Sequence, residues 1–259
     1  MCNDNEYMAP LHLAGRLIME NGGETYRVEE TITRMGHAFG FAEVESFAVP
    51  SGIFISYRKN DGSIETAVKR VRRKGTDLTR VDAVNAVSRR MEAEHLPCEE
   101  VMALLKEIEH RPAKITKLGL IAAVAMSSAG WAAMFGGGLI DSAAAFAVAF
   151  LGQVLAFALD KAGMRSFAST LLGSFLGTLL PMLFNHFTQL LNVEMTVAAC
   201  LMPMLPGLAM TNAVQDTMRG DMISGISSAT SAVLTAAMIA GGALIGSTLF
   251  RLLTGGAIL

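Results

Sequence analysis

A group of polar residues follows two prolines in an otherwise apolar part of the chain. Pro203, Pro206 and Gly207 interrupt a hydrophobic segment that begins near Met195. Each proline removes a backbone donor, so carbonyl groups lose their helical partners. In a membrane such carbonyls need a neighbouring helix or a water-lined cavity, and transporters place broken helices at their substrate sites. The pattern favours a substrate or ion site and a simple packing kink about equally.

The residues after this break continue the polar character. Asn212 and Asp216 are four positions apart, so they share a helix face if the helix resumes. We favour a hydrophilic path for these two, with Asp216 or Asp221 as a contact for a proton or an ammonium group. Capping of the next helix is the simpler interpretation of Asp221. The complete set of candidate path residues is Pro203, Pro206, Gly207, Thr211, Asn212, Gln215, Asp216, Asp221 and Ser224.

Few other polar residues lie in the apolar half. Asp141 is expected to cap a helix near a membrane surface. Gln153 lies deep within an apolar segment, where it either lines a cavity or bonds to a neighbouring helix. His186 follows Asn185 at a segment end, where solvation is the simpler interpretation and protonation the alternative.

A second candidate group surrounds a Gly-Gly pair near the N-terminus. Arg27 either binds a carboxylate ligand or forms an internal ion pair with Glu20 or Glu24, and the ion pair is the more common arrangement. The candidate residues of this part are Glu20, Gly23, Glu24, Arg27 and Glu29.

Motifs for catalysis and metal binding are absent from the sequence. We find no P-loop, dinucleotide fingerprint, zinc-protease motif or nucleophile elbow. The three cysteines, Cys2, Cys98 and Cys200, form neither a metal motif nor a disulfide framework. We therefore predict no catalytic residues, no metal, no cofactor and no enzymatic activity.

The distribution of charge divides the chain in two. Of 259 residues, 52% are hydrophobic and 17% are charged. The six Lys and Arg residues after position 112 are Lys114, Lys117, Lys161, Arg165, Arg219 and Arg251, and the other fifteen of the 21 precede them. This asymmetry predicts a soluble domain at 1–112 and a transmembrane domain at 113–259. No basic patch indicates nucleic-acid binding.

The first domain has the pattern of a small α+β unit. Apolar spacing predicts helices within 10–39, interrupted at Gly22 and Gly23, and further helices at 77–95 and 97–110. Strands are expected at 44–49, 52–57 and 64–71, with turns around Pro50 and around Asp61 and Gly62.

The second domain contains five segments of membrane-crossing length. They lie at about 117–136, 139–159, 167–187, 195–214 and 223–250, and the last is long enough to tilt or to break around Gly241 and Gly242. Lys and Arg residues lie in every second loop between the predicted spans. This distribution predicts that the soluble domain is cytoplasmic and that the C-terminus lies outside. The fold class is a membrane α-helical protein in the lipid bilayer, with about five transmembrane helices after a small α+β cytoplasmic domain.

Three groups of residues resemble signatures of the threonine/serine exporter family. They recur in order and cover nearly the whole chain. They are residues 17–29 (LIMENGGETYRVE), residues 50–54 (PSGIF), and the series Pro206, Gly207, Thr211, Asn212, Asp216, Gly220, Asp221, Ser224 and Gly225.

This resemblance implies secondary export of small polar metabolites across the bacterial inner membrane, driven by the proton motive force. The substrates it implies are threonine, serine or a C4-dicarboxylate such as succinate. Longer members carry a second membrane half, so a chain of five spans resembles the longer subunit of a split exporter with a smaller membrane partner. A homo-oligomer is compatible with the sequence. The alternative is a membrane-anchored sensor or regulatory subunit that binds a metabolite at Arg27.

Overall fold

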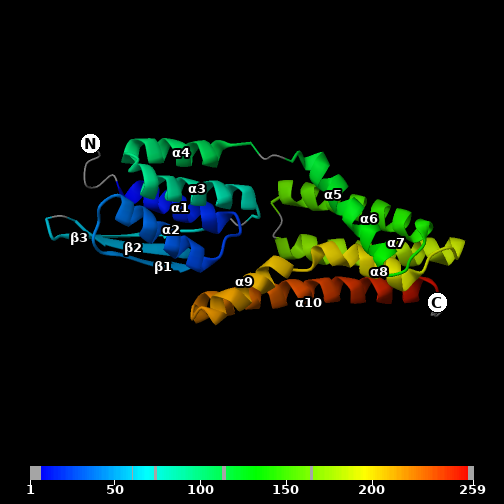
Figure 1. The fold of residues 1–259 in the computed structure, drawn as a ribbon. Coiled ribbons are helices and arrows are strands. Elements are labelled where there is room, and N and C mark those ends of the chain that lie inside the picture. Colours follow the sequence, from blue (N-terminus) through cyan, green and yellow to red (C-terminus); the bar gives the residue numbers. More distant parts are fainter. Residues whose placement is uncertain (1–6, 60, 73–74, 113–114, 164–165, 256–259) are drawn as a thin grey trace. The chain divides into compact units, whose positions relative to one another are not determined.

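The computed structural model describes residues 7–59, 61–72, 75–112, 115–163 and 166–255, and it forms two compact units. The first comprises Met1–Pro112 with Leu208–Thr230, and the second comprises Ala113–Gly207 with Ser231–Leu259. Residues 208–230, which the sequence assigns to the membrane domain, thus group with residues 1–112. Figure 1 shows the course of the chain through both units.

The first unit has the predicted succession of helices and strands. Its elements are α1 (Met8–Glu20), α2 (Thr25–Ala38), β1 (Val44–Val49), β2 (Gly52–Arg58), β3 (Ile64–Arg70), α3 (Leu78–Glu94) and α4 (Cys98–His110). The three strands pair antiparallel in the order β1-β2-β3, with Phe47 opposite Phe54. Local turn residues account for this order, because each predicted turn joins neighbours in the sheet.

The joint between α1 and α2 depends on its two glycines. Gly22 has a φ of +88°, which glycine adopts at little cost. A Cβ on Gly23 would stand 2.4 Å from Cγ2 of Ile18, so only glycine fits without a shift of the backbone or of Ile18. The tight joint brings the start of α2 back against the end of α1.

A continuous apolar core holds this unit together. The helices α1 and α2 supply one side, and alternate residues of β2 supply another. Side chains that are less than 2% exposed include Leu11, Ile18, Ile32, Met35, Ile53, Ile55, Tyr57, Met91 and Leu105. Their burial fixes the face of α2 that remains available for polar contacts.

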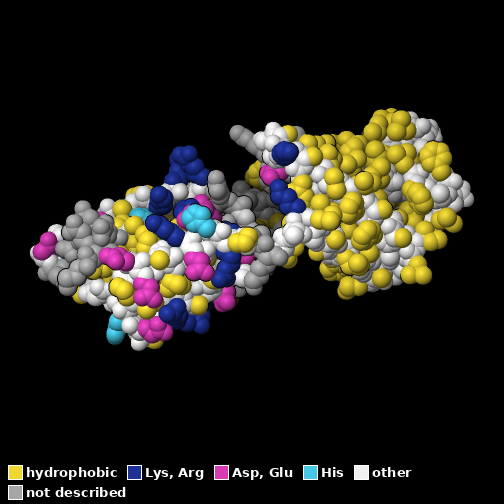
Figure 2. Space-filling model, turned by 90° about the horizontal axis from the view of Figure 1, so that it is seen from above, with side chains coloured by type: hydrophobic (Ala, Val, Ile, Leu, Met, Phe, Trp, Pro, Cys, Tyr) yellow, Lys and Arg dark blue, Asp and Glu magenta, His cyan; other side chains and the backbone are white. Residues whose placement is uncertain are grey.

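The second unit consists of long apolar helices. They are α5 (Lys117–Met134), α6 (Leu139–Lys161), α7 (Ser166–Thr188), α8 (Val193–Leu201) and the short 3₁₀ helix η2 (Met202–Met204), followed by most of α10 (Met222–Leu253). Among the described residues, four helices are long and apolar enough to cross a membrane, or up to five if the bent α8–α9 pair forms one span. Figure 2 shows charged side chains over the first unit and a mainly hydrophobic surface over the second.

The predicted span at 195–214 is divided by its prolines. The segment Val193–Met204 and helix α9 (Gly207–Met218) meet at a bend of 53°. Pro206 cannot donate to the carbonyl of Met202, which accepts the Leu205 amide at 3.2 Å instead. The predicted break is therefore confirmed.

The alternative break at Gly241 and Gly242 does not occur, and α10 is continuous through both residues. Gly242 lies so close to α7 that a Cβ would stand 2.3 Å from the carbonyl oxygen of Leu171. This glycine therefore serves close helix packing, in which small residues let two backbones approach.

Candidate functional site

A buried carboxylate lies at the centre of the candidate site. Asp216 of α9 is 2% exposed, and its Oδ1 atom has no hydrogen-bond partner among the described residues. The backbone amide and hydroxyl of Thr25, at the start of α2, face this carboxyl group. The Thr25 hydroxyl is itself buried and makes no hydrogen bond of good geometry within the described chain. A buried acceptor without a partner is costly, so Asp216 is suited to bind a proton or a donor group.

Two further hydrogen bonds join residues of α9 and of the start of α10 to the first 50 residues. The side chain of Asn212 donates to the backbone carbonyl of Gly22 at 3.3 Å. The hydroxyl of Ser224, at the start of α10, donates to the carbonyl of Ala48 at 3.2 Å, and this bond is buried. Asn212 and Asp216 therefore share a helix face, as their spacing predicts.

Glu29 extends the acidic group from the opposite side. Its Oε1 atom accepts the amide of Ala48 at 2.8 Å. Burial raises the pKa of Glu29 above its ordinary value, and the carboxylates of Asp221 and Asp216 raise it further, although the Ala48 amide acts in the opposite direction. Three carboxyl groups from α2, α9 and the α9–α10 turn thus influence one another.

A positive group closes one end of this arrangement. The guanidinium carbon of Arg219 lies 3.6 Å from the ring centroid of Tyr26, within the range of a cation–π interaction. Burial is the largest single influence on the pKa of Glu24 and acts to raise it, but the hydrogen bond and charge of Arg27, a backbone hydrogen bond and the charge of Arg219 together lower it below its ordinary value. One arginine that the sequence did not single out therefore places a positive charge near Glu24.

Arg27 forms the internal ion pair that was the simpler of its two interpretations. Its Nε atom donates to Glu24 at 2.8 Å, and a second nitrogen donates to the hydroxyl of Tyr26 at 3.2 Å. Glu20 instead pairs with Arg16 at 3.4 Å. Arg27 is thus already occupied in this structure, which weakens its case as a ligand anchor.

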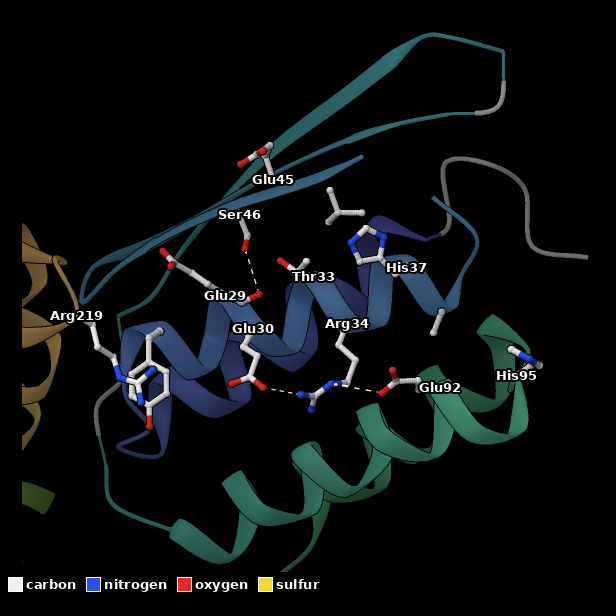
Figure 3. Close-up of a pocket in the computed structure, with 13 residues that line it drawn as sticks. Glu29, Glu30, Thr33, Arg34, His37, Glu45, Ser46, Glu92, His95 and Arg219 are labelled. Atoms are coloured by element: carbon white, nitrogen blue, oxygen red, sulfur yellow. Dashed lines mark hydrogen bonds and ion pairs between the residues drawn. The ribbon is translucent and has the colours of Figure 1, made fainter. Parts of the chain in front are cut away.

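An open cleft of about 860 Å³ adjoins Glu29 and Arg219. It runs between α2, β1 and α3, with Arg34 near its middle (Figure 3). Arg34 forms ion pairs with Glu30 and with Glu92, so its charge is already neutralised. The cleft is therefore a weaker candidate for an anion than the buried group around Asp216.

The predicted path residues fall into two groups. Pro203, Pro206 and Gly207 belong to the second unit. The remaining members belong to the first: Thr211, Asn212, Gln215, Asp216, Asp221 and Ser224. Asp221 directly precedes α10, and its carbonyl accepts the Gly225 amide at 2.9 Å, which fits a position at the helix start.

Gly138, and not Asp141, holds the cap position of α6, but the Asp141 side chain caps this helix from its third residue by accepting the Gly138 amide in a capping box. Asp141 is also a buried tie. It accepts the amide of Gly138 at 2.8 Å, and on its other oxygen it accepts the amide of Asn192 at 2.7 Å and the hydroxyl of Thr196 at 3.1 Å. It joins α6 to the start of α8, which supports a structural role.

The other polar residues of the second unit have distinct environments. Gln153 lines a small cavity, which decides between its two interpretations. Asn185 accepts the amide of Leu191 at 2.9 Å, and His186 makes an edge contact with the ring of Phe250. Among the described residues, no group of three His, Cys, Asp or Glu is arranged to hold a metal ion.

Comparison with known proteins identifies the family. Residues 11–250 match the model of the threonine/serine exporter family, ThrE. A relative from Klebsiella aerogenes, described as the "Probable succinate transporter subunit YjjP", is 24% identical over 212 residues, which cover 81% of this chain and 80% of that protein. No solved structure matches the chain. Because the family match extends over most of its length, as its motifs predict, the chain belongs to the threonine/serine exporter family.

Proposed function

We propose that this chain is a subunit of a proton-linked secondary exporter of small polar metabolites in the bacterial inner membrane. The substrates are threonine- or serine-type amino acids or a C4-dicarboxylate such as succinate. The observation that carries the proposal is the buried Asp216 carboxylate, whose Oδ1 atom lacks a partner within the described chain. Such a group gains most from binding a proton or an ammonium group.

The carboxyl groups near Asp216 provide a way to couple proton binding to substrate binding. Glu29 and Asp221 both act electrostatically within the same group as Asp216. Because nearby like charges disfavour full ionisation, the carboxylates of Asp221 and Asp216 make Glu29 hold a proton more readily than an isolated carboxylate does. A change in the protonation of one group therefore alters the affinity of the others for a proton or a cationic substrate.

Helix length supports a position of this group at the membrane surface, and the distribution of Lys and Arg over the loops favours the cytoplasmic side. Helix α10 has 32 residues, or roughly 48 Å at about 1.5 Å per residue. Residues 231–253, which belong to the second unit, span roughly 35 Å and already match a hydrocarbon core of about 30 Å. Ser224 and the preceding turn then lie outside the core, where a hydrophilic path meets water.

A partner subunit follows from the family relationship. The Klebsiella aerogenes relative is itself described as a transporter subunit. We infer that a smaller membrane subunit completes the path of this chain. The sensor alternative has less support, because Arg27 is paired with Glu24.

The test is efflux of labelled threonine, serine and succinate from cells that lack their native exporters. The cells express the chain with and without the smaller subunit. We expect export only with both subunits, and loss of export in Asp216→Asn at unchanged abundance. Asp82→Asn is the matched control, because Asp82 is exposed on α3. Wild-type efflux by Asp216→Asn would contradict the assignment of Asp216, and no efflux of any substrate by the wild-type pair would contradict the proposed function.

A further inference from the structure

A small cavity lies within the second unit beside the break after α8. Its volume is about 210 Å³, and it is bounded by α5, α6, α7, α8 and η2. Helix α6 contributes one continuous face, since its lining residues recur at helical spacing. These residues are Val148, Ala149, Gly152, Gln153 and Ala156.

Gln153 supplies the one side-chain amide among the described residues that line this cavity, and Ser169 of α7 adds a hydroxyl group. Between Ser142 and Asp160, α6 contains no other polar side chain. The structure records no hydrogen bond from the Gln153 amide to any described residue. A primary amide has two donors and a carbonyl acceptor, and apolar surroundings satisfy none of them. The amide is therefore available to water or to a polar ligand in the cavity.

The opposite wall determines how large a ligand can be. A Cβ on Gly173 of α7 would stand 2.8 Å from Cε of Met204, so the Met204 side chain reaches the α7 backbone. Gly177 faces Cys200 with a Cβ distance of 3.5 Å. The volume of 210 Å³ corresponds to roughly seven water molecules at about 30 Å³ each. A molecule of about seven or eight non-hydrogen atoms would fill it.

The lining of the cavity also restricts the charge of a ligand. No Asp, Glu, Lys, Arg or His belongs to the described residues that line it. An unpaired charge in an apolar environment costs several kcal/mol, and a dianion would cost more. The desolvation cost is lower for a zwitterion, because its two charges partly compensate each other. It is lower still for a molecule without charges. Donors and acceptors on Gln153 can meet a carboxylate, an ammonium group or a hydroxyl.

We propose that this cavity binds the transported molecule, as a small polar solute without net charge, and that Gln153 forms its principal hydrogen bonds. The proposal rests on the proposed export function, and it assigns substrate binding to the second unit rather than to the acidic group around Asp216. It favours a hydroxylated amino acid over a dicarboxylate dianion as the occupant.

Two substitutions separate binding from folding. Gln153→Leu removes the hydrogen bonds and keeps a similar volume. Gly152→Ala adds one methyl group to the cavity wall, and a Cβ at this position meets no atom within 4 Å, so the fold should be unaffected. Gly130→Ala is the matched control, because a Cβ there also meets nothing within 4 Å and Gly130 does not line the cavity.

The experiment measures equilibrium binding of labelled serine, threonine and succinate at neutral pH to the purified full chain, co-expressed with its partner. We expect Gln153→Leu to weaken binding of both amino acids about tenfold, which is the loss of one or two hydrogen bonds. Gly152→Ala should weaken threonine more than serine, because threonine is larger by one methyl group. Gly130→Ala should match the wild type.

The opposite results are equally clear. The proposal would be overturned if both cavity variants bound the amino acids as well as the wild type does. It would also be overturned if the wild type bound succinate more tightly than threonine, or bound none of the three. Because the experiment measures binding and not transport, its result does not depend on whether the protein exports the ligand. Binding that depends on Gln153 without any export would contradict the export function alone, and export that is indifferent to Gln153 would contradict the cavity alone.

Discussion

The hydroxyl of Ser224 donates a buried hydrogen bond of 3.2 Å to the carbonyl of Ala48, although 176 positions separate the two residues. The amide of the same Ala48 donates to Glu29 at 2.8 Å. Both backbone polar groups of one residue at the end of β1 are therefore satisfied by side chains from α2 and α10. A displacement of α10 along its axis would break one of these bonds, and protonation of Glu29 would weaken the other.

Replacing Ser224 by alanine should destabilise the first unit. Ala48 is 1% exposed, so its carbonyl would lose its partner without gaining water. The expected cost is about 1 to 3 kcal/mol. Thermal unfolding of the purified protein in detergent would report it as a lower melting temperature. Ser227→Ala, at an exposed position of the same helix, is the control and should leave the melting temperature unchanged. Equal melting temperatures for the two variants would show that the bond contributes nothing.

Replacing Glu29 by glutamine should change how stability depends on pH. Burial, followed by the carboxylates of Asp221 and Asp216, raises the pKa of Glu29 in the folded protein. The folded state thus holds this proton more tightly than the unfolded chain does. The resulting stabilisation is complete below the ordinary glutamate pKa and is lost as the pH rises through the raised pKa. Glutamine remains neutral and still accepts the Ala48 amide, so it avoids this loss.

The measurement for this prediction is the difference in melting temperature between Glu29→Gln and the wild type from about pH 4 to about pH 8. The difference should be smallest at acidic pH and should grow in favour of glutamine toward neutral pH. Glu45→Gln is the control, because Glu45 is exposed on β1. A difference that shrinks as the pH rises would mean that the ionised form of Glu29 stabilises the fold.

Local sequence signals predict most of the elements, but not their assignment to the two units. The turns, the Gly-Gly joint and the proline break are encoded by neighbouring residues, and all of them occur as expected. Residues 208–230 are apolar enough to resemble membrane helix, and Met210 and Val214 remain more than half exposed there. Hydropathy reports composition and not neighbours, so it does not reveal that this segment groups with residues 1–112.

The same limit applies to the candidate site. The spacing of Asn212 and Asp216 places both on one face, but nothing local indicates that this face meets Gly22 and Thr25. Thr25 lies within the N-terminal motif, but it is uncharged, and the sequence indicates its charged neighbours Glu24 and Arg27 as candidates instead. One sequence holds no information on pairs that lie 190 positions apart. Arg219 was considered only for loop charge, and its cation–π contact with Tyr26 depends on the fold.

Replacing Arg27 by alanine tests the sensor alternative. Arg27 is about one-third exposed and pairs with Glu24 at 2.8 Å, so the pair should contribute less than about 1 kcal/mol. We expect nearly unchanged thermal stability and unchanged export. Efflux of labelled threonine and serine over a range of internal concentrations would check this. A shift in the concentration that gives half-maximal efflux, at unchanged abundance, would instead support metabolite binding at Arg27.

The two adjacent glycines of α10 should respond very differently to the same substitution. In Gly242→Ala, the new Cβ would stand 2.0 Å from the Ser174 hydroxyl oxygen and 2.3 Å from the Leu171 carbonyl oxygen. The Leu171 backbone cannot rotate away, so α7 and α10 must separate, at a cost of about 1 to 3 kcal/mol.

In Gly241→Ala the Cβ meets no atom within 4 Å. Alanine also favours helix more than glycine does, so this variant should be as stable as the wild type or slightly more so. Melting temperature and membrane abundance, measured for both variants, would check the contrast. Equal behaviour of the two would mean that α7 and α10 do not pack closely at Gly242.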